Sequence, residues 1–133
     1  MKSLFIIQLF FLFAFATYNP DWVVTNPFNN LYKPTNVTAA SQAWIFHLNN
    51  VTVCGNAQSD FNVYQFSYKL MIKDTVFYYG TKDLAHQTVP AGSQYCFTYD
   101  FLIPSIPSPG FSVNLTLQSP ADDICSIGVY FPI

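Results

Sequence analysis

Glutamate and arginine are absent from this 133-residue chain. The side chains left for catalysis or metal binding are two histidines, three cysteines and seven aspartates. A serine hydrolase triad would need His47 or His86, and neither lies near a Gly-x-Ser-x-Gly nucleophile elbow. Cys96 and His86 could pair on paper as nucleophile and base, but no group in the sequence would activate the thiol. Asp122-Asp123 is more simply a solvated turn than a catalytic carboxylate pair. We therefore expect no enzymatic activity, with His47 a half-buried strand residue and His86 a loop residue.

The cysteines indicate neither a metal site nor a redox motif. Cys54, Cys96 and Cys125 lie far apart, and none belongs to a Cys-x-x-Cys pair. We expect no metal and no cofactor. Three cysteines allow at most one intramolecular disulfide, which leaves one thiol over and keeps a disulfide-linked dimer open.

The composition favours apolar contacts over ionic ones. After residue 16 the chain has four lysines and seven aspartates, which are too few cations to neutralise a nucleic acid backbone, so no nucleic acid partner is expected. Phe and Tyr number 14 and 9, about twice the usual share of aromatic residues. Such an excess of rings suits a hydrophobic cavity or a binding face. A compositional bias of the source genome would explain it equally well.

Residues 1–16 have the pattern of a cleaved signal peptide. A lysine near the start precedes an apolar run at 4–15, and Ala14 and Ala16 supply the small residues that a signal peptidase reads. A dozen residues are too few to cross a bilayer of roughly 30 Å as a helix, and the alternative is an uncleaved anchor. We expect residues 17–133 to form one mature domain.

Three Asn-X-Ser/Thr sequons support passage through a secretory compartment. They begin at Asn36, Asn50 and Asn114, and we expect these residues to be glycosylation sites. Asn114 belongs to the polar face of an alternating stretch, where a glycan could project into solvent. The expected location is extracellular, or the lumen of the secretory or endolysosomal pathway.

Apolar residues recur with a period of two, which is typical of strands with one buried face. The clearest stretches are 64–73, 95–101 and 111–118, and residues 43–54, 75–79 and 125–133 are also rich in strand-forming types. In the first stretch the pattern places Tyr64 on the same face as Phe66. Turn-forming clusters occur at 27–30, 55–60, 90–93, 104–110 and 119–123. Strands of this kind without a convincing helix predict an all-β fold, an immunoglobulin-like antiparallel β-sandwich.

The proline-rich stretch before the strand at 111–118 has a local explanation. Pro104, Pro107 and Pro109 cannot donate to a strand ladder, so the segment is expected to be an irregular or edge connection. Gly110 frees the backbone just before the strand begins. The isoleucines of this segment could rest on an apolar rim.

Together these residues resemble the C-terminal half of an ML domain, the lipid-recognition family of the Niemann-Pick type C sterol carrier and the phosphatidylglycerol/phosphatidylinositol transfer proteins. The resemblance rests on DLAHQTVPAG at 83–92, an aromatic strand, Ile103-Pro104 to Pro109-Gly110, FSVNLTLQ at 111–118, Asp122-Asp123 and Cys125. It covers residues 76–133 well. Residues 21–75 match more loosely, through Trp22 and Gly55.

The chain departs from the family in its cysteines. Ala85 and Val89 stand where the family usually has a cysteine pair. Cys125 matches the family's late cysteine, but the partner expected just after Trp22 is missing, because residues 23–26 read VVTN. Cys54 and Cys96 are candidates for a substitute bridge, although connectivity is not readable from sequence.

The resemblance implies a sandwich that opens to hold a sterol or phospholipid in an apolar cavity between its sheets, as a carrier without catalysis. Residues expected to line the cavity are Phe66, Tyr68, Leu70, Phe97, Tyr99, Phe101, Phe111, Val113, Leu115, Val129 and Phe131. Its rim would be formed by Ile103, Pro104, Ile106 and Pro107. Stripes with a period of two are also what an ordinary sandwich core shows, so a core without a ligand stays open.

A second function is compatible with the same residues. The sandwich could present aromatic loops to a membrane or to a partner receptor, as a lipid-dependent interaction module or co-receptor. Such a module needs an exposed apolar patch, whereas a carrier needs a closed cavity. Lys69, Lys73 and Lys82 could meet anionic headgroups, or they could simply be solvated. For the carrier we expect a monomer with a lipid ligand and transient membrane contact.

Overall fold

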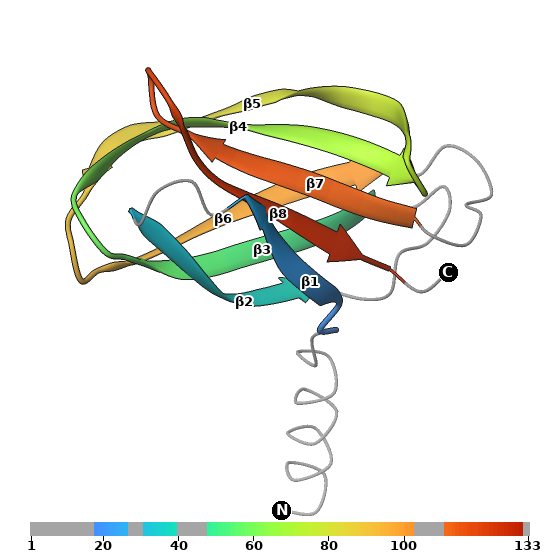
Figure 1. Ribbon diagram of the computed structural model, residues 1–133, viewed down its shortest axis with the longest axis horizontal. Helices are drawn as coiled ribbons and strands as arrows, with labels where there is room; N and C mark the ends of the chain where they lie inside the picture. The colour runs from blue at the N-terminus through green and yellow to red at the C-terminus, as the bar shows by residue number, and fades with distance from the viewer. Residues whose placement is uncertain (1–17, 27–30, 40–47, 103–110, 132–133) are drawn as a thin grey trace, which may run out of the picture.

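The computed structural model describes residues 18–26, 31–39, 48–102 and 111–131, and these form eight strands. The expected antiparallel β-sandwich is confirmed (Figure 1). The strands are β1 Asp21–Asn26, β2 Tyr32–Ala39, β3 Leu48–Ala57, β4 Phe61–Ile72, β5 Thr75–Val89, β6 Gln94–Leu102, β7 Phe111–Gln118 and β8 Asp123–Tyr130. The first sheet has the order β1-β8-β7-β4-β5 and the second the order β2-β3-β6, with antiparallel neighbours throughout.

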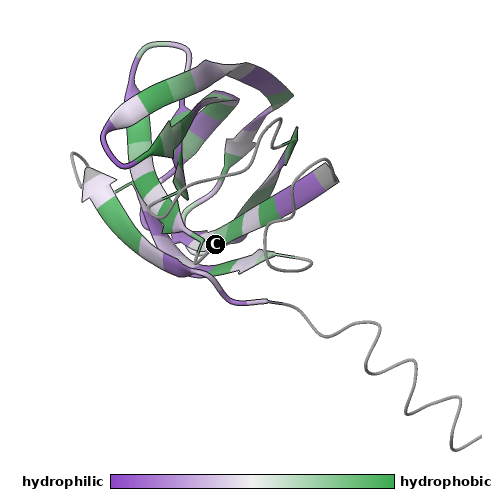
Figure 2. Ribbon diagram, turned by 90° about the vertical axis from the view of Figure 1, so that its right-hand side faces the viewer, coloured by the Kyte–Doolittle hydropathy of each residue, from purple (hydrophilic) through white to green (hydrophobic). Residues whose placement is uncertain are grey.

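The alternation of the sequence places one face of each sheet in the core. Along β7, Val113, Leu115 and Leu117 are buried, while Asn114 and Thr116 are half-buried on the outer face. Figure 2 shows the result as hydrophobic and hydrophilic residues that alternate along the strands. The outer faces carry hydroxyl pairs across neighbouring strands, such as Thr52 Oγ1 and Thr98 Oγ1 at 2.9 Å.

The two sides of the sandwich differ. On one side Tyr18, just before β1, exchanges two backbone hydrogen bonds of 2.7 and 2.8 Å with Ala39 at the end of β2, and so links the two sheets. On the other side β5 is the edge of the five-stranded sheet and β6 is the edge of the three-stranded one. Phe97 and Tyr99 of β6 pack on β4 and Phe101 packs on β7, while β5 is exposed along most of its length, so β5 overhangs the smaller sheet.

The sandwich also has two distinct ends. At the hairpin end, β4 turns into β5 through Lys73 and Asp74, and Lys73 has a positive φ of 56°. At the opposite end, β5 turns into β6 through residues 90–93, where Gly92 has a φ of 84°. The cluster at 90–93 was expected to turn. A left-handed backbone at Gly92 is readily adopted because glycine lacks a Cβ.

Four local expectations were wrong. Tyr64 is exposed, not inward-facing, because the ladder between β4 and β5 shifts register between Val63 and Gln65. His86 lies in β5 and not in a loop, and its ring stacks on Tyr64 with centroids 4.4 Å apart. Lys73 belongs to the hairpin turn, because β4 ends at Ile72. The turn expected at 55–60 starts later, since β3 continues to Ala57.

Candidate functional site

The residues expected to line a cavity come together between the two sheets. Tyr68 is half-buried and the other ten are buried, and they come from the inner faces of β4, β6, β7 and β8. The expected rim residues Ile103, Pro104, Ile106 and Pro107 lie outside the described residues, as does His47. The sequence thus identified buried residues of both sheets, and their role as a cavity lining stays a prediction. It missed the contributions of β2 and β3, where Val37, Val51 and Val53 are fully buried.

Aromatic rings run through this region as a continuous series, which we call the aromatic ladder. It starts at the overhanging strand, where Tyr78 stacks on Tyr68 with centroids 5.9 Å apart. Tyr68 stacks on Tyr99 of the facing sheet at 4.4 Å, and Tyr99 stacks on Phe101 at 5.3 Å. The full ladder is Tyr78, Tyr68, Tyr99, Phe101, Phe111 and Phe131, with Phe77 packed on Phe111 from the side. It leads from the surface of β5 to the buried centre of the hairpin end.

Three tyrosine hydroxyl groups meet where the ladder reaches the surface. Partial burial raises the pKa of Tyr68, and its side-chain hydrogen bond with Tyr78 raises it further. Burial also raises the pKa of Tyr99, with smaller contributions from Tyr68 and Tyr78. The raised pKa values keep the phenols of Tyr68 and Tyr99 neutral at physiological pH, so both retain their O–H donors. A polar group placed at this opening would meet hydroxyl donors and acceptors beside apolar ring faces.

Gly80 leaves room for the Tyr68 ring on the side of the sandwich where β5 and β6 are the edge strands, which we call the open side. Gly80 is opposite Tyr68 in the β4–β5 ladder. A Cβ at Gly80 would lie 2.5 Å from the Tyr68 hydroxyl oxygen and 2.8 Å from its Cζ. Any larger residue here would displace the ring. An aromatic ring that covers a cross-strand glycine near a sheet edge is a known stabilising arrangement.

A second cluster of rings closes the interior at the other end. Tyr32 makes edge-to-face contacts with Phe61 and Tyr95, with centroids 5.8 and 6.4 Å apart. The Tyr32 hydroxyl donates a hydrogen bond of 2.9 Å to the backbone carbonyl of Tyr95. Burial, with smaller effects of Cys125 and Tyr95, raises the pKa of Tyr32 well above its usual value. The Tyr32 ring is thus held in place by a hydrogen bond at this end.

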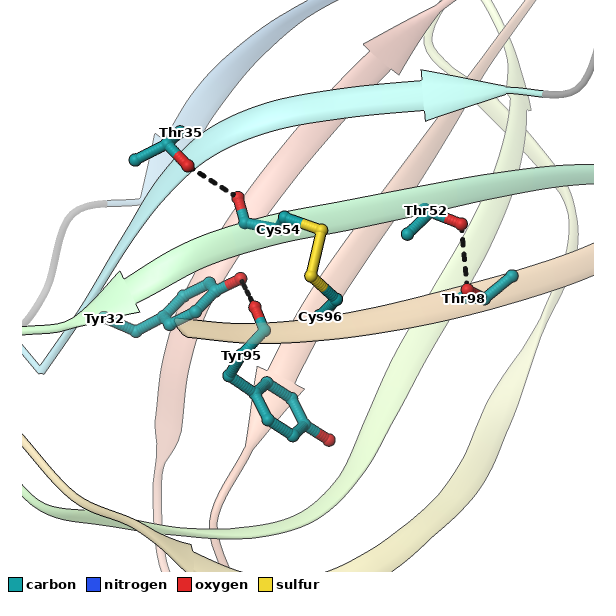
Figure 3. The surroundings of a disulfide bond; sticks show 7 residues. All are labelled: Tyr32, Thr35, Thr52, Cys54, Tyr95, Cys96 and Thr98. Atoms are coloured by element: carbon teal, nitrogen blue, oxygen red, sulfur yellow. Dashed lines mark hydrogen bonds between the residues drawn. A yellow bond between two sulfur atoms is a disulfide. The ribbon is translucent and has the colours of Figure 1, made fainter. Parts of the chain in front are cut away.

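The expected substitute bridge between Cys54 and Cys96 is confirmed. The two residues are directly opposite each other in β3 and β6, with Cα atoms 4.1 Å apart, and their sulfur atoms are bonded (Figure 3). Thr35 donates from Oγ1 to the Cys54 carbonyl at 3.3 Å. A disulfide in a small domain is typical of an oxidising compartment. The bond also removes Cys96 as a thiol nucleophile for His86.

Cys125 is the third cysteine, and it is buried as a free thiol at the start of β8. Burial raises its pKa to about 11, so the thiol is neutral and unreactive at physiological pH. The other two cysteines, Cys54 and Cys96, are bonded to each other. A role in packing is enough to explain it.

Two hollows on the described surface are small and polar, and a third of about 360 Å³ beside Tyr64 and His86 is larger and less polar. One of about 200 Å³ is lined by Tyr64, the amides of Gln65 and Gln118, and the turn carrying Asp122 and Asp123. Another of about 210 Å³ contains Asn114 and Lys69 among hydroxyl side chains. Asn114 donates from Nδ2 to Met71 Sδ at 3.1 Å, so this sequon asparagine is held on the outer face.

The described residues contain no group of three or more histidine, cysteine or acidic side chains that could hold a metal ion. Within that same part of the chain, no helix is long and apolar enough to cross a membrane.

Comparison with solved structures supports the fold. Chicken MD-1, in a complex with lipid IVa, superposes with a TM-score of 0.55 at 7% identity, over 88% of this chain and 96% of that chain. A Niemann-Pick type C2 protein from the Japanese carpenter ant has a TM-score of 0.51 at 10% identity, over 87% and 97%. The C-terminal domain of wzt has a TM-score of 0.55 at 12% identity, over 88% and 75%. At such identities the likeness shows a shared fold and nothing finer.

No family model matches the sequence. No curated protein matches it either. One solved neighbour nevertheless carries the name of the Niemann-Pick type C carrier to which the sequence resemblance points, and another was solved with a lipid.

Proposed function

We propose that this chain is a non-catalytic lipid-binding protein that holds a sterol or phospholipid between its two sheets. The observation that carries the proposal is the aromatic ladder, which joins the open side at Tyr78 to the buried rings of Phe101 and Phe111. Because the ladder reaches the surface at Tyr78, the apolar chain of a ligand that enters there would contact aromatic rings continuously on its way inward. Chicken MD-1, which shares the fold, was solved in a complex with lipid IVa, and this supports a lipid as the ligand.

The energy balance favours admission of an apolar chain. Separating two stacked ring pairs would cost about 1–3 kcal/mol beyond lost burial. Burying a sixteen-carbon chain gains on the order of 12 kcal/mol before costs of association and ordering. The ladder crosses from one sheet to the other through stacked rings, Tyr68 of β4 and Tyr99 of β6, at an interplanar angle of 23°. Sheets joined through such contacts can part along them.

The tyrosine hydroxyls define where the polar end of the ligand would sit. Tyr68, Tyr78 and Tyr99 lie together where the ladder reaches the surface, and the raised pKa values of Tyr68 and Tyr99 keep those two phenols neutral at physiological pH. A sterol hydroxyl or the ester region of a phospholipid would find hydrogen-bonding partners there, with its apolar part directed along the ladder. The eleven residues named from the sequence as the cavity lining, and the rim at residues 103–107, belong to this proposal.

The proposal includes the cellular setting. We infer a signal peptide at residues 1–16, a mature monomer of residues 17–133, and a location outside the cell or in a secretory or endolysosomal lumen. The Cys54–Cys96 disulfide supports an oxidising compartment. Glycans at Asn36, Asn50 and Asn114 are part of the same inference.

Native mass spectrometry of the protein secreted from its own cell type tests the proposal, followed by organic extraction and identification of lipids. We expect one sterol or phospholipid molecule per chain. A protein that emerges empty, and stays empty when offered sterol and phospholipid vesicles, would contradict the carrier. The alternative of a membrane-binding or receptor-binding module would then gain support.

A further inference from the structure

The overhanging strand β5 exposes four consecutive apolar residues. Val76, Phe77, Tyr78 and Tyr79 are 40%, 37%, 55% and 75% exposed. Both faces of the strand contribute, since Tyr78 and Phe77 contact rings of the inner face while Tyr79 is opposite Lys69 on the outer face. Soluble proteins usually protect an edge strand with charges, prolines or bulges along its length. A bare aromatic edge therefore requires a specific partner.

Lysines surround this edge, and their distribution is uneven. The β4–β5 hairpin carries Lys69, Lys73 and Lys82 against Asp74 and Asp83. The remaining described residues carry one lysine and five aspartates. The aromatic edge is thus part of a net positive hairpin on a chain whose other described parts are net negative. This distribution of charge favours an anionic partner at the hairpin. It disfavours an anionic partner at the other described parts of the chain.

The partner that combines apolar and anionic character at a surface is a lipid bilayer with acidic headgroups. Tyrosine is suited to the membrane interface because its ring is apolar and its hydroxyl is polar. Lysine stems can extend along the membrane while their ammonium groups reach phosphates. The outer edge of β5 has no partner strand in the described chain. Its backbone groups must therefore stay hydrated, so this edge can enter the headgroup region of a bilayer but not the hydrocarbon core. Shallow insertion, of roughly 5–10 Å, fits these constraints.

We propose that residues 76–79, flanked by Lys69, Lys73 and Lys82, form a docking edge for anionic lipid bilayers. The consequence for transfer rests on the proposed function: Tyr78 is the first ring of the aromatic ladder, so docking places the open side of the sandwich against the membrane. A lipid could then move between bilayer and interior without its apolar part crossing water. Docking itself does not depend on a bound ligand.

Co-sedimentation with vesicles tests the docking edge. The vesicles contain phosphatidylcholine and phosphatidylglycerol in equal amounts, or phosphatidylcholine alone, at low and high salt. We expect the unaltered protein to bind the anionic vesicles preferentially and to dissociate as salt rises. Changing Tyr78 and Tyr79 together to Ser should weaken this binding at least about tenfold by removing the apolar contact. Tyr64→Ser with Tyr130→Ser is the matched control, because both residues are exposed tyrosines away from the edge.

A second pair of variants tests the charge. Lys73→Gln should weaken binding to anionic vesicles about fivefold, the effect of one lysine near an anionic surface. Lys33→Gln, on β2 of the other sheet, should have no effect. Thermal unfolding of every variant checks that these surface changes leave the fold intact.

Other outcomes separate docking from the proposed function. If neither pair of variants differs from its control, or the unaltered protein ignores anionic vesicles, the docking edge is overturned. If size-exclusion chromatography with light scattering shows a dimer that Tyr79→Ser dissociates, a second copy covers the edge, and docking is again overturned. If vesicle binding follows the prediction while extraction yields no lipid, docking stands and the carrier function fails.

Discussion

Tyr68 of β4 and Tyr99 of β6 stack with ring centroids 4.4 Å apart at an angle of 23°, which makes this pair a direct link between the two sheets beside the open side. Other ring contacts between the sheets are tilted or edge-to-face, as Phe66 is to Phe97 at 38° and to Tyr99 at 80°, whereas this one joins two nearly parallel faces. The pair lies between the surface ring of Tyr78 and the buried ring of Phe101. In the proposed carrier, it is therefore the place where stability of the closed sandwich and admission of a ligand oppose each other.

A double-mutant cycle on this pair should measure that opposition. Tyr68→Leu and Tyr99→Leu keep apolar volume but remove the ring faces. We expect a coupling of about 0.5–1.5 kcal/mol in the free energy of unfolding, determined by denaturant titration. Both variants should also change the affinity for a fluorescent sterol or phospholipid.

The exposed stack of Tyr64 and His86 is the control, because its centroid separation is the same 4.4 Å. Leucine at Tyr64 should leave ligand affinity unchanged. A Tyr68–Tyr99 coupling near zero, with unchanged affinity in both variants, would show that the contact does not hold the sheets together.

Phe97→Asp should abolish lipid binding. Phe97 is buried in β6 and packs on Phe66 with centroids 5.3 Å apart. Loss of the ring alone costs about 3–5 kcal/mol, and an unpaired carboxylate among these rings adds to it. Leu102→Asp, at the exposed end of the same strand, should leave folding and binding intact. A folded Phe97→Asp protein that retains its lipid in native mass spectrometry would show that the ligand lies elsewhere.

Removal of the disulfide should destabilise the fold without altering the core. Cys54 and Cys96 are 42 residues apart. A disulfide that closes a loop of this length stabilises the folded state by about 4 kcal/mol, because it restricts the conformations of the unfolded chain. We expect the double change to Ser to lower the free energy of unfolding by that order. Reductant should lower the melting temperature of the unaltered protein and leave that of the double variant unchanged. Equal sensitivity of both proteins to reductant would exclude this bond as the source of the effect.

The sequence predicted the strand faces well because alternation is a local property. Phe97, Tyr99 and Phe101 follow it without interruption. It failed at Tyr64, where a register shift against β5 turns the ring outward, since a bulge depends on the partner strand. The Cys54–Cys96 pairing likewise depends on the register of β3 on β6, which only the assembled sheet fixes.

The docking edge could not be read from the sequence for a related reason. TVFYY at 75–79 has the composition of a buried strand. Its exposure follows from the width of the sheets: five strands face three, so the last strand is left without a cover. Strand number and order are properties of the whole chain. The sequence could therefore place these residues in a strand without showing that the strand overhangs.

Cys125 should make stability depend on pH in the alkaline range. Burial raises the thiol pKa from 9.0 to about 11, so the folded state holds its proton where the unfolded chain has released it. The resulting stabilisation is fully present below pH 9 and is lost as the pH rises through about 11, with a total of roughly 2–3 kcal/mol. The raised pKa values of Tyr32 and Tyr99 act in the same direction. Denaturant titrations between pH 8 and 11 on the unaltered protein and on Cys125→Ala isolate the thiol together with its interaction with Tyr32, because the Tyr99 contribution cancels in the difference. The same shift should slow alkylation by iodoacetamide at pH 8 about a hundredfold relative to the unfolded chain, in proportion to the thiolate fraction. Parallel stability curves for the two proteins, or rapid alkylation of the folded chain, would show that Cys125 is not buried between the sheets.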